Sequence, residues 1–431
     1  MGRTDFRERP ASAGLEWQLS RAEVWLLVAI LVTRLVYVLL ATQVDPFLQK
    51  DPLYGDAKPF DHAAWSLVTG KGFDLEVHRA PLHGLMMAAV YAMVGHQPDA
   101  VRVLQALMAP FAALFYLVGF RALFGRKVGL CFLVLTLLQP QLLHVTGWLY
   151  SENLVLLLVG ALFVAHLAAL RSDWEVRAAV IVGVLFGLLS LTRPTFLPML
   201  VLYALWLLFR LPSGRRLAVL GAVVLPALIV ISPWTYRNYN VYGAFVPISL
   251  AGGVFAGFNS PKSYGKMPPT FHLWPMKDGT VIDVWAETKG QSRYEIDKFY
   301  GRTALRWVLE NPGHTLAQIP KKYYNTLSPL GTGVPTAQRP WQAGSKVQML
   351  ADAVFFAYLV ICVWGLGRAL RRYWAELIPF TLMAFTIFLA VTVFGGTSRY
   401  LLPLAPAFLA GFCVILCRWR APVNDVPTEQ H

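Results

Sequence analysis

Apolar runs about as long as a membrane span recur along this chain of 431 residues. A hydrocarbon layer about 30 Å thick is crossed by about 20 apolar residues in an α-helix. In a helix, each backbone N–H and C=O group is hydrogen-bonded within the segment, and lipid offers no hydrogen-bond partners in its place. The sequence therefore predicts an all-α polytopic membrane protein with about ten spans. The apolar runs cover residues 24–42, 100–120, 128–147, 153–170, 178–192, 195–209, 217–233, 350–367, 375–394 and 400–417.

Composition agrees with this class of protein. Hydrophobic residues make up 56% of the chain and charged residues only 14%, whereas about a quarter of a soluble domain is charged. The net charge of +14 would suggest nucleic acid in a soluble chain. Here the basic residues lie mostly between apolar runs, where they set orientation and meet anionic headgroups. Membrane lipids are the expected partners of this charge, and nucleic acid is not.

The distribution of basic residues predicts the topology. Residues 82–95 are apolar but too short for a regular span. If this segment lies on or in the outer leaflet without crossing, five short basic connections fall on the side of the N-terminus, as the positive-inside tendency requires. We therefore expect cytoplasmic tails at 1–22 and 418–431, a catalytic module at 23–234 with an exoplasmic loop at 43–98, an exoplasmic segment at 235–348, and the last spans at 349–417.

The exoplasmic segment is expected to be mostly helical. Aromatic and apolar residues recur at helical spacing over Asp283–Leu309. Asn311-Pro312 ends this helix, and a second one is predicted over His314–Leu327. Interfacial helices are also expected within the first exoplasmic loop.

The first exoplasmic loop is rich in carboxylates, and other polar residues that interrupt the apolar pattern fall on the same side of the membrane. The acids of the loop are Asp45, Asp51, Asp56, Asp61, Asp74 and Glu76. The other polar residues expected at this face are Arg79, Glu152, Arg193, Arg237 and Arg399. Guanidinium groups bind phosphate in a bidentate manner, and a carboxylate can accept a proton. This combination suits chemistry on a phosphate-bearing lipid.

These residues lie in a pattern that resembles a known family. The pattern consists of Asp56 with Phe60-Asp61, Gly72-Phe73, Arg79-Ala80-Pro81-Leu82, Ser151-Glu152, Thr192-Arg193-Pro194, Ser232-Pro233-Trp234-Thr235-Tyr236-Arg237-Asn238-Tyr239, Gly252-Gly253 and Ser398-Arg399-Tyr400. It is similar, in order along nearly the whole chain, to the GT-C glycosyltransferases that use polyprenol-phosphate sugars, such as protein O-mannosyltransferases and the lipid A aminoarabinose transferase.

The resemblance implies a GT-C fold and an inverting sugar transfer. The donor would be a sugar on a polyprenyl phosphate, and the acceptor a hydroxyl of a lipid, glycan or protein. By position in the motif, Asp56 would be the general base, and Arg79, Arg237 and Arg399 would bind the donor phosphate. Glu152 matches an acidic position that faces the basic residue at Arg79, and Asp61 and Arg193 would be supporting residues. The compact versions of the family indicate a bacterial inner membrane, with the active site facing the periplasm or exterior.

The chain also departs from the family pattern. Ala57 and Pro59-Phe60 stand where some relatives have an acidic residue and an Arg-Tyr pair. His78 stands where certain relatives carry a metal-binding glutamate. A divalent metal stays an open alternative without further support, and no cofactor is predicted.

Several alternative interpretations stay open at this point. Asp56 and Glu152 could each cap a helix N-terminus, and the arginines could reach toward headgroups as interfacial anchors. Arg34 interrupts the first span, where an ionisable group is either functional or paired inside the bundle. The alternative function is a transporter or flippase of lipid-linked saccharides. That class predicts paired repeats and interrupted spans with ionisable groups near the midplane, whereas this chain shows little internal repetition.

Overall fold

The computed structural model describes residues 15–44, 55–74, 78–268, 270–328 and 346–418. It is a bundle of helices with one two-stranded hairpin, and each predicted apolar run is helical. The helices of the bundle are α1 (Arg21–Val44), α3 (Leu82–Val94), α4 (Pro98–Phe124), α5 (Arg126–Leu138), α6 (Pro140–His144), the 3-10 helix η2 (Val145–Gly147), α7 (Glu152–Arg171), α8 (Val176–Thr192), α9 (Phe196–Arg210), α10 (Ser213–Tyr242), α15 (Lys346–Tyr373), α16 (Ile378–Phe394), the 3-10 helix η4 (Ser398–Leu404) and α17 (Ala405–Leu416).

Six helices of the described chain are long and apolar enough to cross a membrane, and a seventh crossing is possible if α5 and the helices after it form one span. That pair is bent by 60° because Pro140 has no N–H to continue the helix, and Gln139 before it is extended. The apolar helices α8, α9 and α16 match the remaining predicted runs but have only 15 to 17 residues.

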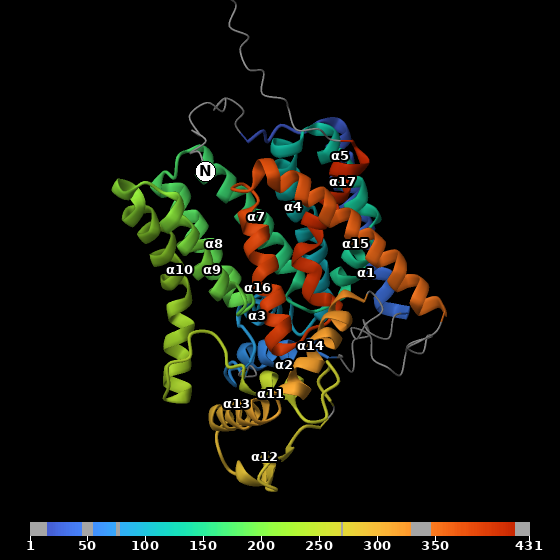
Figure 1. Ribbon diagram of the computed structural model, residues 1–431. Helices are drawn as coiled ribbons and strands as arrows, with labels where there is room; N and C mark the ends of the chain where they lie inside the picture. The colour runs from blue at the N-terminus through green and yellow to red at the C-terminus, as the bar shows by residue number, and fades with distance from the viewer. Residues whose placement is uncertain (1–14, 45–54, 75–77, 269, 329–345, 419–431) are drawn as a thin grey trace, which may run out of the picture.

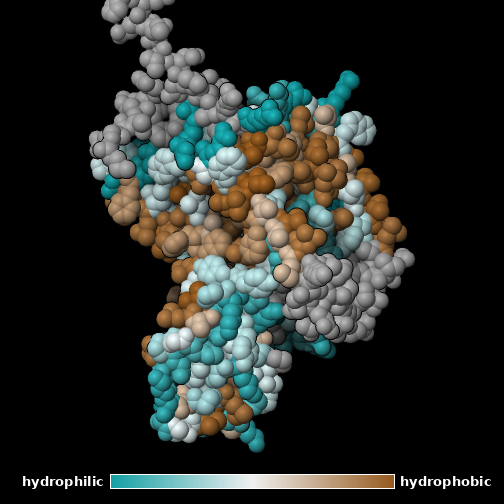
Figure 2. Space-filling model, turned by 45° about the vertical axis from the view of Figure 1, so that its right-hand side comes forward, coloured by the Kyte–Doolittle hydropathy of each residue, from teal (hydrophilic) through white to brown (hydrophobic). Residues whose placement is uncertain are grey.

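The outside of the bundle is apolar, as lipid requires. Large hydrophobic side chains such as Val32 on α1, Ile229 on α10 and Trp364 on α15 are mostly exposed. Figure 2 shows such residues gathered across the bundle, while the lobe below it is mainly hydrophilic. A soluble protein rarely exposes so much contiguous apolar surface, so this face identifies an integral membrane protein.

The remaining elements gather at one end of the bundle (Figure 1). They are α2 (Ala57–Val68), α11 (Gly252–Asn259), β1 (Leu273–Pro275), β2 (Val281–Asp283), α12 (Val284–Glu287), α13 (Arg293–Glu310) and α14 (Pro312–Leu327). Strands β1 and β2 are antiparallel, with Trp274 opposite Ile282. The connection between α4 and α5 lies at the opposite end (Figure 1). Helices in the first loop and a mostly helical segment between α10 and α15 are therefore confirmed.

Three boundaries differ from the sequence expectation. Helix α10 continues to Tyr242, past the end of its apolar run, so Arg237 lies on its last turns and not on a loop. The expected helix Asp283–Leu309 is two helices, because Ser292 and Glu295 form a capping box that starts α13. The last apolar run begins as the 3-10 helix η4 and becomes α-helical only at Ala405. The expected domain bounds and cytoplasmic tails stay predictions.

One buried contact joins α13 to α11, and a second joins α14 to α11 and to the bundle helix α16. The carboxylate of Asp297 on α13 accepts hydrogen bonds from the N–H groups of Gly252 and Gly253, at 2.9 and 2.8 Å. A Cβ at Gly252 would lie 2.1 Å from the Asp297 carbonyl oxygen, which explains the glycine pair by close packing. Lys322 on α14 donates to Asn259 on α11 and to the Thr392 and Val393 carbonyls at the end of α16.

Candidate active site

The backbone at the start of α2 places Asp56 at the polar end of the bundle. Gly55 before it has a φ of +54°, a left-handed conformation that favours glycine, and a Cβ there would lie 2.8 Å from the Tyr150 hydroxyl. Asp56 occupies the N-cap position of α2, but its side chain makes no capping hydrogen bond. The helix-cap interpretation of this carboxylate is therefore wrong for the side chain.

The Asp56 carboxylate lies between two arginines from distant parts of the chain. Arg79 Nη2 donates to Asp56 Oδ1 at 2.9 Å, and Arg399 Nη2 donates to Asp56 Oδ2. The Asp56 side chain is still 30% exposed. A ligand can therefore reach the carboxylate and its two ion pairs. Arg79 and Arg399 thus each contact a different oxygen of the same carboxylate.

The electrostatics of Asp56 follow from this placement. Burial acts to raise the pKa of the carboxyl, but the charges and hydrogen bonds of Arg399 and Arg79 outweigh it and hold the pKa well below its usual value. Asp56 is therefore ionised at neutral pH. With both arginines in place it is also a weak base, because a group of low pKa accepts a proton poorly.

Glu152 forms a second centre of negative charge at the start of α7. Its side chain is 1% exposed. Arg193 Nη2 donates to Glu152 Oε1 at 2.5 Å, and Arg399 Nε lies 3.0 Å from the same oxygen. Glu152 was expected to face Arg79, but in the structure Arg79 pairs with Asp56, and Arg399 connects the two carboxylates. Arg193 also donates to the Ser151 hydroxyl at 3.4 Å.

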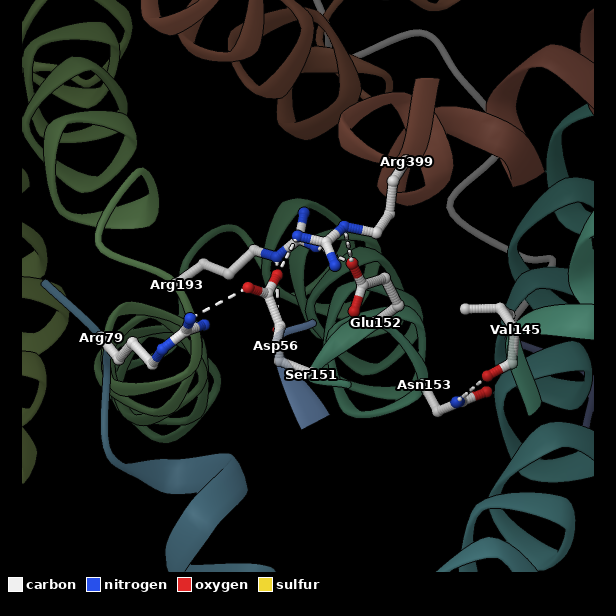
Figure 3. A network of polar contacts seen from close by, with 8 residues as sticks. All are labelled: Asp56, Arg79, Val145, Ser151, Glu152, Asn153, Arg193 and Arg399. Carbon is white, nitrogen blue, oxygen red and sulfur yellow. Dashed lines mark hydrogen bonds and ion pairs between the residues drawn. The ribbon is translucent and has the colours of Figure 1, made fainter. Parts of the chain in front are cut away.

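The five side chains form one network of alternating charge (Figure 3). In order they are Arg79, Asp56, Arg399, Glu152 and Arg193. Three guanidinium groups face two carboxylates, so the network carries one positive charge in excess. An excess of guanidinium charge next to an ionised carboxylate favours binding of a phosphate ester beside a base.

Tyr150 is a site residue that the sequence did not single out. The guanidinium carbon of Arg399 lies 4.6 Å from the centre of the Tyr150 ring, a cation–π contact that fixes the guanidinium plane. Arg193 lies over Tyr400 in the same way, at 6.0 Å. An aromatic residue two positions before an acid at the start of a span was the available signal, but interface aromatics are common enough to hide it.

Arg237 is not part of this network, and the expectation that it binds the donor phosphate stays a prediction. Its Nη2 donates to the Phe73 carbonyl at 3.0 Å, and its guanidinium lies 4.7 Å from the centre of the Trp234 ring. The neighbouring Asn238 is buried and donates to the Val246 and Ile248 carbonyls. This motif therefore ties the first loop and the returning chain to the end of α10.

Asp61 is likewise outside the network. Its Oδ1 accepts a hydrogen bond from the Tyr91 hydroxyl at 2.5 Å and lies 3.0 Å from His96 Nε2. The Trp65 ring stacks on His96, with ring centres 4.9 Å apart. These contacts join α2 to α3, so Asp61 supports the helix that carries Asp56.

The other acids of the first loop add nothing to the network. Asp74 pairs with Arg293 on α13, and Asp45, Asp51 and Glu76 lie outside the described residues. Over the described ranges no group of three or more metal-ligating side chains gathers at one point. The divalent metal raised by His78 therefore gains no support from the residues that the structure describes.

Comparisons with known proteins give structural matches alone. No protein-family model and no curated protein matches the sequence. The chain is similar to ArnT from Cupriavidus metallidurans bound to undecaprenyl phosphate, at 13% identity over 91% of this chain and 77% of that one, with a TM-score of 0.43. It is also similar to ArnT from the same organism in the apo state, at 15% identity over 92% and 77% of the two chains and a TM-score of 0.40.

A further match is the archaeal oligosaccharyltransferase AglB from Archaeoglobus fulgidus, in complex with an inhibitory peptide and a dolichol-phosphate. The identity is 13%, the TM-score is 0.49, and the match covers 93% of this chain but 51% of AglB. Similarity this low concerns the course of the fold, and no residue role is taken from it.

Proposed function

We propose that this protein is an inverting glycosyltransferase that moves a sugar from a polyprenyl phosphate to a hydroxyl of a lipid, glycan or protein acceptor. One observation carries the proposal: the Asp56 carboxylate lies between the guanidinium groups of Arg79 and Arg399, at the polar end of an apolar bundle. A lipid-borne phosphate presents its headgroup at that depth. The resemblance in sequence motifs points to the same chemistry.

The reaction needs a single base and a stabilised leaving group. As the acceptor hydroxyl loses its proton to Asp56, its oxygen forms a bond to the anomeric carbon. The bond from that carbon to the phosphate oxygen breaks, and its electron pair stays on the polyprenyl phosphate. Direct displacement inverts the anomeric centre. Arg79 and Arg399 are placed to stabilise the charge that grows on the phosphate.

Donor binding would make Asp56 a stronger base. A phosphate that draws Arg79 and Arg399 toward itself weakens their contacts with the carboxylate, and the pKa of Asp56 rises toward its usual value. Arg399 also keeps its contact with Glu152, which limits how far it moves. The base therefore becomes competent when the donor is in place, and an unloaded enzyme holds it paired.

The orientation belongs to the same proposal. Helices α2 and α11–α14 lie at one end of the bundle, and the connection between α4 and α5 lies at the other (Figure 1). The latter connection is basic, with Arg126 and Lys127 at the start of α5, and basic connections favour the cytoplasm. We place the site at the outer face of a bacterial inner membrane.

Binding of the leaving group tests the proposal directly. The full-length protein in nanodiscs is titrated with undecaprenyl phosphate, and Arg79→Gln is compared with Arg237→Gln, which removes an arginine outside the network. A charge-assisted hydrogen bond contributes about 1.5–3 kcal/mol, so Arg79→Gln weakens binding by about 10-fold to 150-fold. Arg237→Gln changes it by less than about threefold. Equal losses in both variants, or no binding by the natural protein, contradict the proposal.

Transfer of a radiolabelled sugar from a polyprenyl-phosphate donor is the second measurement. An enzyme releases polyprenyl phosphate and labels an acceptor. A transporter or flippase instead moves the intact lipid across proteoliposomes without breaking the bond to the sugar, and that result favours the alternative function.

A further inference from the structure

A second polar feature lies inside the bundle, on α1. Arg34 lies about 20 Å along this helix from its start and is only 2% exposed. Its Nη2 donates to the Thr136 carbonyl at 3.2 Å, but Nε and Nη1 have no hydrogen-bond partner. The Thr136 hydroxyl is also buried without a partner. Two kinds of donor are thus left unsatisfied at one place in an apolar interior.

The charge of Arg34 is not balanced by the described residues around it. An arginine keeps its charge in proteins, and none of the described carboxylates forms an ion pair with it. Tyr37, one turn further along α1, is hydrogen-bonded to His144 Nδ1 at 2.7 Å, and a tyrosine is neutral at physiological pH. The Thr136 carbonyl near the end of α5 supplies part of a helix dipole, worth about half a charge at most, and it meets one nitrogen only.

Arg34 and Thr136 line a cavity within the bundle. The cavity has a volume of about 40 Å³, whereas a single buried water needs about 10–15 Å³. Apolar side chains such as Ile30, Phe132 and Leu156 make most of its wall. The space therefore admits an ion of halide size with a water or two, and not a sugar.

We propose that this cavity is a binding site for a small monovalent anion of the chloride class, held by Arg34 Nε and Nη1 and by the Thr136 hydroxyl. All three groups can donate a hydrogen bond, so their common ligand must be an acceptor. Water would satisfy the donors but leave the charge of Arg34 uncompensated in a low-dielectric interior, which is costly. An anion satisfies the donors and neutralises the charge together.

The neighbouring polar groups that line the cavity do not compete for the anion. The Thr146 hydroxyl donates to the Leu142 carbonyl at 3.0 Å, and the Asn153 amide nitrogen donates to the Val145 carbonyl at 2.8 Å. The Tyr116 hydroxyl donates to the Leu156 carbonyl at 2.9 Å. Among the polar atoms of this wall, Arg34 Nε and Nη1 and the Thr136 hydroxyl are the buried donors without a hydrogen-bond partner in the described chain.

Thermal unfolding of the full-length protein in detergent tests the site. Chloride is raised from about 1 to 150 mM against gluconate at constant ionic strength. Anion binding to the folded state raises the melting temperature of the natural protein by about 2–5 °C. Arg34→Met, which keeps the volume, abolishes the rise, and Thr136→Val reduces it. Arg177→Met, which removes an exposed arginine at the start of α8, retains it in full.

Crystals soaked in bromide give an independent readout that needs no variant. An anomalous difference peak between the Arg34 guanidinium and the Thr136 hydroxyl supports the site. Water without anomalous signal there, or a chloride-dependent rise that Arg34→Met retains, overturns it. Neither measurement depends on sugar transfer, so each can contradict the anion site without contradicting the proposed function.

Discussion

Asp56→Asn separates the base from the rest of the site. Asparagine keeps the size of the side chain and one acceptor oxygen for Arg79 or Arg399, but it cannot take a proton. A positioned general base contributes about 10²- to 10⁴-fold to a rate, which corresponds to about 2.7–5.4 kcal/mol of barrier at 1.36 kcal/mol per decade. We expect the rate constant of sugar transfer to fall by that factor.

Donor affinity does not fall with the rate in the same variant. Without the Asp56 charge the network has two positive charges in excess and not one, and both arginines lose the anion that competes with the phosphate. A charged hydrogen bond contributes about 1.5–3 kcal/mol. We therefore expect the dissociation constant of the donor to stay level or to fall by about tenfold.

The assay follows transfer of labelled sugar from a polyprenyl-phosphate donor in single turnovers, with donor binding measured separately. Asp74→Asn is the matched control, since Asp74 belongs to the same loop and pairs with Arg293 outside the network. The melting temperature shows that the variant is folded. Turnover within threefold of the natural protein at saturating donor refutes the assignment of Asp56. If donor affinity falls by the same factor as turnover, then the claim that Asp56 acts as a base without binding the donor phosphate is refuted.

Three further predictions concern buried charges and close helix packing. Glu152→Gln removes a buried charge that two arginines contact, so we expect a loss of about 3–5 kcal/mol of stability in thermal or denaturant unfolding, whereas the exposed Glu287→Gln is neutral. Burial lowers the pKa of the Lys322 ammonium to about 8, below its value of about 10.4 in the unfolded chain. The unfolded state therefore binds more protons between these values, and stability rises with pH across that window. The natural protein should gain about 1–3 kcal/mol over Lys322→Met between pH 7 and pH 10, and parallel curves for the two proteins argue against a buried ammonium. Gly365→Ala places a Cβ 1.9 Å from the Gly411 carbonyl oxygen between α15 and α17, so we expect a loss of about 1–3 kcal/mol. Gly367→Ala meets nothing within 4 Å and should be neutral or slightly stabilising, and equal effects of the two substitutions would contradict the close packing.

The helices could be predicted from local patterns, but the joints between them could not. Apolar runs and helical spacing are properties of neighbouring residues, and they located each span and the helices of the outer segment. The bend after α5 was missed because the mean hydropathy stays high across Gln139 and Pro140. The backbone nevertheless cannot continue there as a helix. The end of α10 was missed because polar residues extend a helix past the apolar layer without any change in backbone preference.

Local patterns in the sequence establish that the chain is a helical membrane protein and which acids and arginines interrupt its apolar pattern. Which of these side chains meet depends on how the helices pack in three dimensions. Asp56 and Arg399 are 343 positions apart, and no local pattern encodes a contact across that separation. Arg237 carries the same charge as Arg399 and lies on the last turns of α10, yet helix packing directs it to the Phe73 carbonyl. Ion pairs act over a few ångströms, so the packing of the helices selects the partners.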